Sequence, residues 1–169
     1  MTDLAALAAS GQDLLPGECA ELARRAAEAL ALDGGESADR GGSASLLWRD
    51  EHSEAWLATW SVDRDTGFHD HDGSCGGIYV IEGRVTEEPL VMGRPPLVRE
   101  YRTGDTFSFA GGHIHRMNHD PGAVTIHVYS PPLRSLGVYD LVDGVLTRTP
   151  QSPDEETPAT PSIDEAIRG

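Results

Sequence analysis

Residues Gly67–Gly77 read GFHDHDGSCGG, which places two histidines one residue apart in a short β-type run. Side chains two residues apart leave the same face of a strand, so His69 and His71 can converge on one ion while Asp70 points away. Two imidazoles alone hold a labile ion poorly, and a third ligand is therefore expected from another strand. His115, in the later run His113-Ile114-His115, is the residue expected to supply it.

Other histidines compete for the role of third ligand. His113 lies two residues before His115 and would share its face of a strand, so it is the main competitor. His119 is a weaker competitor. The three tryptophans, Trp48, Trp56 and Trp60, are expected to pack in the core rather than to form a binding platform.

Length and charge narrow the class of protein. A chain of 169 residues is typical of one domain with a sizeable core. Its formal net charge of −15 argues against nucleic acid or an anionic membrane as a partner. No apolar stretch is long enough for a membrane span and no signal peptide is evident, so a cytoplasmic location is expected. The two cysteines do not form a disulfide framework, and the oligomeric state stays open.

The chain divides into three parts. Residues 1–42 form a helical segment and a Gly-rich linker, with two helices over 3–31 broken at Pro16-Gly17. Residues 43–146 contain short β-type runs bounded by Gly, Pro, Asp and Asn, which is typical of a sandwich or barrel. Residues 147–169 combine prolines with Ser, Thr, Asp and Glu, so this tail is expected to be disordered.

Two motifs in the β-rich part resemble those of the cupin superfamily. Residues 69–83 resemble the first cupin motif, with Gly76 in the place where a glutamate is normal. Residues 104–115 resemble the second motif, with Ala110 where a proline is usual. The resemblance implies a mainly β fold, a single jelly-roll barrel that follows a short N-terminal helical segment.

A third stretch is more specific. Residues 125–132 read TIHVYSPP and, with His115-Arg116 upstream, are similar to the cysteine dioxygenase (thiol dioxygenase) branch of the cupins. The resemblance implies Fe(II) held by three histidines, here His69, His71 and His115, with O2 as cosubstrate. It also implies a catalytic relay beside the metal, made of Thr125, His127 and Tyr129.

The chemistry of the residues supports that branch. Without the glutamate, three neutral imidazoles leave the full charge on the ion, which can then accept an anionic thiolate and an amine. Tyr129, two residues from His127 on an alternating strand, would face the same interior and could hydrogen-bond oxygen or substrate. The predicted function is oxidation of L-cysteine with O2 to cysteine sulfinic acid. Alternatives are another small thiol (3-mercaptopropionate or cysteamine), a diverted cysteine oxidation in biosynthesis, or a non-catalytic metal- or ligand-binding cupin.

Two further residues bear on the substrate and on modification. A substrate carboxylate needs an arginine fork, and the resemblance points to Arg49 as the substrate-binding residue alongside Tyr129. Some members of the family carry a cysteine bonded to the active-site tyrosine. Counted without gaps from His71, that position falls on Gly76, so Cys75 is expected on the other side of the strand and without a crosslink.

Overall fold

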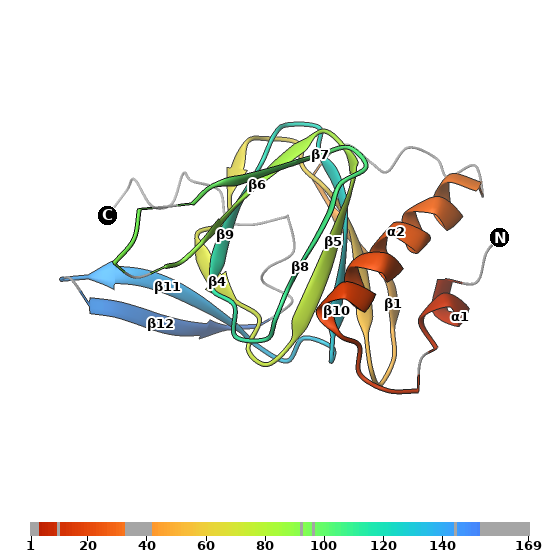
Figure 1. The fold of residues 1–169 in the computed structure, drawn as a ribbon, viewed down its shortest axis with the longest axis horizontal. Helices are drawn as coiled ribbons and strands as arrows, with labels where there is room; N and C mark the ends of the chain where they lie inside the picture. Colours follow the sequence, from red (N-terminus) through yellow and green to blue (C-terminus); the bar gives the residue numbers. More distant parts are fainter. Residues whose placement is uncertain are drawn as a thin grey trace.

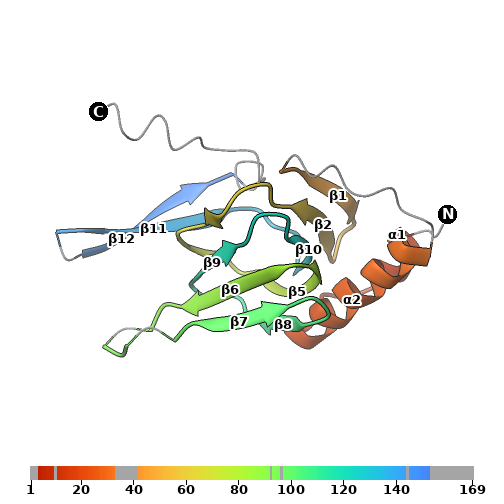
Figure 2. The ribbon, with the colours of Figure 1, turned by 90° about the horizontal axis from the view of Figure 1, so that it is seen from above.

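Two antiparallel sheets face one another and form a barrel, with two helices against one side (Figures 1 and 2). The computed structural model describes residues 4–9, 11–32, 42–91, 93–95, 97–143 and 145–152. The expected mainly β, jelly-roll architecture is confirmed.

The first sheet has five strands in the order β1-β2-β10-β5-β8. These are β1 (Ala44–Arg49), β2 (Glu54–Thr59), β10 (Val124–Ser130), β5 (Cys75–Glu82) and β8 (Thr106–Phe109). The second sheet has the order β12-β11-β4-β9-β6-β7, with β3 (Arg64–Asp65) paired to β9. Its other strands are β12 (Val145–Gln151), β11 (Leu136–Val142), β4 (Phe68–Asp70), β9 (His115–His119), β6 (Arg84–Pro89) and β7 (Arg99–Arg102).

Strand alternation divides the side chains of the first sheet between two apolar clusters. On β10, Ile126 and Val128 belong to the cluster on the outer face, whereas Tyr129 belongs to the core between the sheets. On β5, Ile78 and Val80 belong to that inner core. The relay expected on β10 therefore points into the barrel.

The helices cover the outer face of the first sheet (Figure 1). α1 (Leu4–Ala8) and α2 (Pro16–Leu32) confirm the two expected helices, but the break precedes Pro16. Proline suits a first helical turn because its missing N–H has no partner there, and the carboxylate of Glu18 accepts the backbone N–H of Leu15 (2.7 Å). Neither helix is long and apolar enough to cross a membrane in the described part of the chain.

The C-terminal part corrects one expectation. Val145–Gln151 form β12, which pairs with β11 along its whole length, so order extends past the boundary at residue 146. The prediction of a disordered tail from residue 147 was therefore wrong for 147–151, because strand pairing overrides a polar, proline-containing composition. The rest of the predicted tail, residues 153–169, lies outside the described residues, as do residues 33–41 of the linker.

Candidate metal centre and active site

Three histidines converge inside the barrel. His69 lies on β4 opposite His115 on β9, and His71 follows β4 directly. Their ring centroids are 4.8 to 5.3 Å apart, and one nitrogen from each lies within 4.8 Å of the others. All three side chains are buried, and His69 and His71 point to the same side, as strand alternation predicted. The structure thus brings together the three residues predicted as metal ligands.

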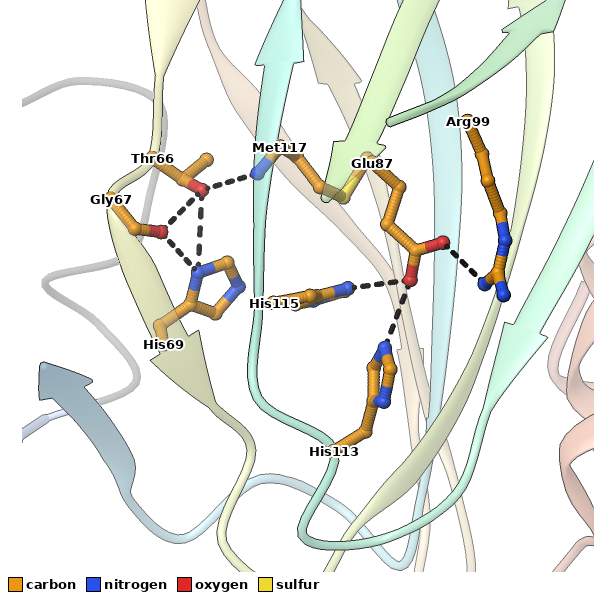
Figure 3. A network of polar contacts seen from close by, with 8 residues as sticks. All are labelled: Thr66, Gly67, His69, Glu87, Arg99, His113, His115 and Met117. Atoms are coloured by element: carbon orange, nitrogen blue, oxygen red, sulfur yellow. Dashed lines mark hydrogen bonds and ion pairs between the residues drawn. The ribbon is translucent and has the colours of Figure 1, made fainter. Parts of the chain in front are cut away.

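Hydrogen bonds orient two of these imidazoles (Figure 3). Nδ1 of His69 lies 3.1 Å from the carbonyl oxygen of Gly67, and Nδ1 of His115 lies 3.1 Å from Oε1 of Glu87. Each acceptor favours the tautomer that carries its proton on Nδ1 and directs the Nε2 lone pair toward the cluster. Nε2 of His115 is buried and has no hydrogen-bond partner among the described residues, so the donor set fits a divalent metal ion.

Burial keeps the imidazoles of His71 and His115 neutral, which is the form that binds metal. Burial, helped by the neighbouring His69 and opposed by the hydrogen bond with Glu87, lowers the pKa of His115 to about 4. The pKa of His71 is held well below 6.5 by burial and by its histidine neighbours. Burial alone would raise the pKa of Glu87, but hydrogen bonds from His113 and His115 outweigh it and keep this carboxylate ionised.

His113 lies beside the three-histidine cluster and hydrogen-bonds to Glu87, the residue that orients His115. Its Nε2 is 3.0 Å from the same Oε1 of Glu87 that accepts from His115 (Figure 3). Glu87, His113 and His115 form a second group with donor atoms close together, but His113 is not part of the three-histidine cluster. The other competitor, His119, stacks on Trp60 with ring centroids 3.6 Å apart.

The space next to Gly76 is occupied by an aromatic ring. A Cβ atom at this position would lie 2.4 Å from Cζ of Phe109, closer than real Cβ atoms approach another atom. The Phe109 ring stacks on His71 (4.7 Å) and meets His115 edge to face (4.9 Å). The Phe109 ring on β8 therefore fills the space that a side chain at position 76 of β5 would enter, where the first cupin motif normally has a glutamate.

The three residues of the expected relay form a buried chain of hydrogen bonds. Nε1 of Trp60 donates to Oγ1 of Thr125 (3.1 Å), which lies 2.8 Å from Nε2 of His127. Nδ1 of His127 lies 3.2 Å from the hydroxyl oxygen of Tyr129. When Thr125 donates to His127, Nδ1–H of His127 donates to Tyr129, and the hydroxyl hydrogen of Tyr129 can reach a ligand. Burial lowers the pKa of His127 to about 3, so this imidazole is neutral.

Tyr129, at the end of the chain of hydrogen bonds, lies against the three-histidine cluster. The rings of Tyr129 and His71 stack with centroids 5.1 Å apart. Trp60, expected only as core packing, is buried in the core and also supplies the first donor of the chain.

Arg49 lies on the edge strand of the first sheet. Its Nε donates to Oε2 of Glu54 at 2.6 Å, and its guanidinium carbon lies 5.7 Å from the centre of the Trp56 ring. Glu54 faces Tyr129 across the neighbouring strand pair. Glu54 on β2 therefore lies between Arg49 on β1, the residue expected to bind substrate, and Tyr129 on β10.

Asp70 holds the C-terminal hairpin to β4, the strand that carries His69. Arg148 on β12 donates to both of its carboxylate oxygens (2.8 and 2.9 Å), and the Tyr139 hydroxyl on β11 donates at 2.5 Å. These bonds, with Arg148 first, hold the pKa of Asp70 well below its ordinary range. Asp70 points away from the three-histidine cluster, as expected, but its partner Arg148 lies on β12, a strand that sequence reasoning missed.

Cys75 lies on the face of β5 opposite the site. Its Sγ lies 3.9 Å from Sγ of Cys19 on α2 and 3.2 Å from the carbonyl oxygen of Leu14. It is Gly76 that pairs with Tyr129. Cys75 therefore belongs to the outer cluster under the helices, which agrees with the one-residue offset read from the sequence.

Sequence reasoning also missed Glu87. Its strand reads RVTEEP over Arg84–Pro89, where Val85 is buried and Glu87 shares its face by alternation. A glutamate at the inward position of a strand was the signal that could have revealed it, because a buried carboxylate requires partners.

The fold and the histidine cluster define a jelly-roll protein of the cupin type with a candidate metal centre. A family model described as cysteine dioxygenase type I matches residues 49–141, more than half of the chain, and the protein belongs to this family.

Solved structures with a similar course of the chain come from varied proteins. KdgF from Halomonas sp. has 18% sequence identity and a TM-score of 0.47, with 57% of this chain and 84% of that chain covered. A protein from Bacillus halodurans has 18% identity and a TM-score of 0.49, with 66% and 80% covered. A variant of oxalate decarboxylase from Bacillus subtilis has 16% identity and a TM-score of 0.46, with 55% and 26% covered. The family assignment rests on the family model.

Proposed function

We propose that this protein is an iron-dependent thiol dioxygenase that oxidises L-cysteine with O2 to cysteine sulfinic acid. The observation that carries the proposal is the buried chain of hydrogen bonds from Trp60 to Tyr129, which ends against His71 of the metal cluster. A site that only stores a metal or a ligand does not require a neutral chain of hydrogen bonds that ends against one of the three histidines. A cytoplasmic location is part of the proposal, because free thiols persist in a reducing compartment.

In this proposal the histidines hold the metal and the barrel interior supplies a dry site. His69, His71 and His115 would hold Fe(II), through Nε2 of His69 and of His115 and through one nitrogen of His71. When bound, Fe(II) supplies the O2 chemistry that adds both oxygen atoms to the thiol sulfur. Three neutral ligands leave the ion its full charge, which favours binding of the substrate as a thiolate.

The other residues orient the substrate. The Tyr129 hydroxyl donates a hydrogen bond to the substrate or to oxygen, and His127, fixed by Thr125, holds the phenol in place. Arg49 binds the substrate carboxylate with its planar fork, which selects thiols that carry this group. No step requires these side chains to change their charge.

The experiment is O2 consumption by the Fe(II)-loaded protein with L-cysteine, 3-mercaptopropionate and cysteamine. Mass spectrometry should find a product heavier than cysteine by the mass of two oxygen atoms. Tyr129→Phe should retain iron but lower turnover or uncouple O2 uptake from sulfinate formation. Tyr79→Phe is the matched control, because Tyr79 packs in the outer cluster, and its activity should equal that of the wild type.

The alternatives give different results. Faster uptake with 3-mercaptopropionate or cysteamine would reassign the thiol and keep the reaction. If protein with one iron per chain consumed no O2 with any of the three thiols, the dioxygenase proposal would be wrong and a non-catalytic cupin would replace it.

A further inference from the structure

Glu54 is a carboxylate buried on the inner face of the first sheet. Its side chain is 0% exposed. On β2 its neighbour Ala55 belongs to the outer cluster and Ala58 to the inner core, so alternation turns Glu54 inward. It pairs with Arg49 on one side and with Tyr129 on the other. Partners directly opposite in antiparallel strands share a face, so all three side chains project from the same face of the sheet.

Both oxygens of this carboxylate are hydrogen-bonded. Oε2 accepts from Nε of Arg49 (2.6 Å) and Oε1 accepts from Nε1 of Trp56 (3.0 Å). A carboxylate out of water is costly unless it is paired and hydrogen-bonded, and these two donors meet that requirement. Neither partner is one of the metal-binding histidines or a member of the chain of hydrogen bonds that ends at Tyr129.

The two ends of the ion pair differ in their exposure. The Arg49 side chain is 42% exposed, whereas that of Glu54 is fully buried. A half-exposed arginine loses much rotamer freedom when it binds a ligand. Here the Arg49 guanidinium is held before any ligand binds. The Glu54 carboxylate accepts a hydrogen bond from it, and its carbon lies 5.7 Å from the centre of the Trp56 ring.

The choice of Nε by Glu54 sets the direction of the arginine fork. A guanidinium binds a carboxylate through two parallel N–H groups, either Nε with one terminal nitrogen or the two terminal nitrogens together. Because Nε bonds to Glu54, the edge formed by the two terminal nitrogens is the one presented to a ligand.

We propose that Glu54 is a positioning residue that orients Arg49 for a substrate carboxylate, and that it thereby restricts the substrates to thiols that carry this group. The inference rests on the proposed function. It adds a residue that lies outside the motifs through which the sequence resembles its family.

Glu54→Gln tests the proposal, because it keeps the size and one acceptor oxygen but removes the charge. The KM for L-cysteine should rise about 10-fold while kcat changes less than about 2-fold, since a charged hydrogen bond becomes a neutral one. Cysteamine has no carboxylate, so its KM should stay within about 2-fold of the wild-type value. Anaerobic calorimetric titration of the Fe(II)-loaded protein should give the same contrast in binding, without turnover.

Glu100→Gln is the matched control, since Glu100 pairs with Arg84 across strands and with Arg102 on its own strand, but at the sheet edge. Its KM for both thiols should equal the wild-type value. Trp56→Phe provides a second variant that does not depend on burying a glutamine. It removes the donor to Oε1 and should raise the dissociation constant for L-cysteine about 3-fold, again without effect on cysteamine.

An unchanged affinity for L-cysteine in both variants would overturn the role of Glu54. A higher affinity would overturn it too, because Glu54 would then compete with the substrate for Arg49 instead of supporting it. An equal loss for L-cysteine and cysteamine would make Glu54 a general structural residue. Failure of the proposed function is a separate result, seen as absence of O2 uptake by the wild-type protein with every thiol.

Discussion

His115 and His113 were both candidates for the third metal ligand. The hydrogen bonds of their ring nitrogens distinguish the two. Nδ1 of His115 bonds to Glu87, which leaves Nε2 buried among the rings of His69 and His71. His113 uses its own Nε2 for Glu87 and is more exposed. The two histidines therefore share a carboxylate but only His115 offers a nitrogen to the three-histidine cluster.

His115→Ala should abolish stoichiometric Fe(II) binding, whereas His113→Ala should retain about one iron per chain. The reason is that loss of one of three ligands leaves an incomplete site, while loss of His113 leaves Glu87 bonded to His115. Metal analysis after anaerobic reconstitution and dialysis measures both variants. If His113→Ala lost the iron and His115→Ala kept it, the third ligand would be His113.

Gly76→Ala should destabilise the protein without removing a functional group. The added methyl meets the Phe109 ring at 2.4 Å, and such overpacking costs about 1–3 kcal/mol. Thermal unfolding should show a midpoint lowered by roughly 2–4 °C per kcal/mol. Gly73→Ala is the control, because a Cβ atom there meets nothing within 4 Å. Equal midpoints for the two variants would mean that Phe109 moves aside freely.

The protein should carry no thioether between Cys75 and Tyr129. The two side chains lie on opposite faces of their sheet, and no rotamer change moves a side chain through a strand. Intact mass and peptide mapping of the Fe(II)-loaded protein, after exposure to cysteine and air, measure this. A deficit of two hydrogens located on these two residues would contradict the placement of Cys75.

The residues that alternation and motif spacing predict are those that lie close in sequence. His69 and His71 follow from one strand, and Thr125, His127 and Tyr129 from another. Glu87 and Phe109 could not be found in this way, because their contacts with the histidines come from strand pairing between distant segments. The partner of Arg49 was missed for the same reason, since the role of Glu54 becomes visible only when β2 is paired with β1 on one side and with β10 on the other.

At the scale of elements, the hairpin of β11 and β12 supports β4, the strand that carries His69 of the three-histidine cluster. β4 has only three residues, and β11 pairs with it at Phe68, His69 and Asp70. Composition alone predicted a disordered tail from residue 147, because composition carries no information on the pairing of Arg148 with the buried carboxylate of Asp70. The sequence thus predicted the barrel strands but not the last one.

Arg148→Ala should lower stability at neutral pH and much less in acid. Asp70 has a lowered pKa in the folded protein, so the stability it contributes is present above its ordinary pKa of 3.8 and is lost as pH falls below that value. Loss of a charged hydrogen-bonded pair should cost about 2 kcal/mol at pH 7. Thermal unfolding of the variant and the wild type from pH 7 to about pH 2 measures the difference, which should stay constant down to about pH 4 and shrink below it, as the pH falls toward the lowered pKa of Asp70.

Arg102→Ala is the matched control, since Arg102 pairs with Glu100 at the surface and such pairs contribute less than about 1 kcal/mol. A difference between Arg148→Ala and the wild type that stayed constant with pH would show that the arginine stabilises the hairpin through packing instead.

At the scale of the whole molecule, the N-terminal helices are part of the barrel's structure. A Cβ atom at Gly77 of β5 would lie 2.0 Å from the backbone nitrogen of Ala20, so α2 and the sheet touch at their backbones. The outer cluster joins Ala23 and Ala26 of α2 to Ile126 and Val128 of β10. The division of the chain at residue 42 therefore separates segments that share one core.

A chain that begins at Ser43 should not fold into a stable monomer. It would expose the outer cluster of the first sheet to water, and an apolar sheet face without cover favours aggregation. Thermal unfolding and size-exclusion chromatography of residues 43–152, against residues 1–152, measure this. A monomeric fragment with a cooperative transition at the midpoint of the longer chain would show that the helices are dispensable.

The placement of the cysteines has a consequence for the durability of the catalyst. Under the proposed function, an oxidant of sulfur forms repeatedly inside the barrel, and any thiol within its reach would be consumed. Cys19 lies on α2 and Cys75 projects from the outer face of β5, so the backbone of β5 separates both thiols from the barrel interior. The protein's own sulfur is thereby shielded from its chemistry, so loss of activity during turnover should come from oxidation of the iron and not from oxidative damage to these cysteines.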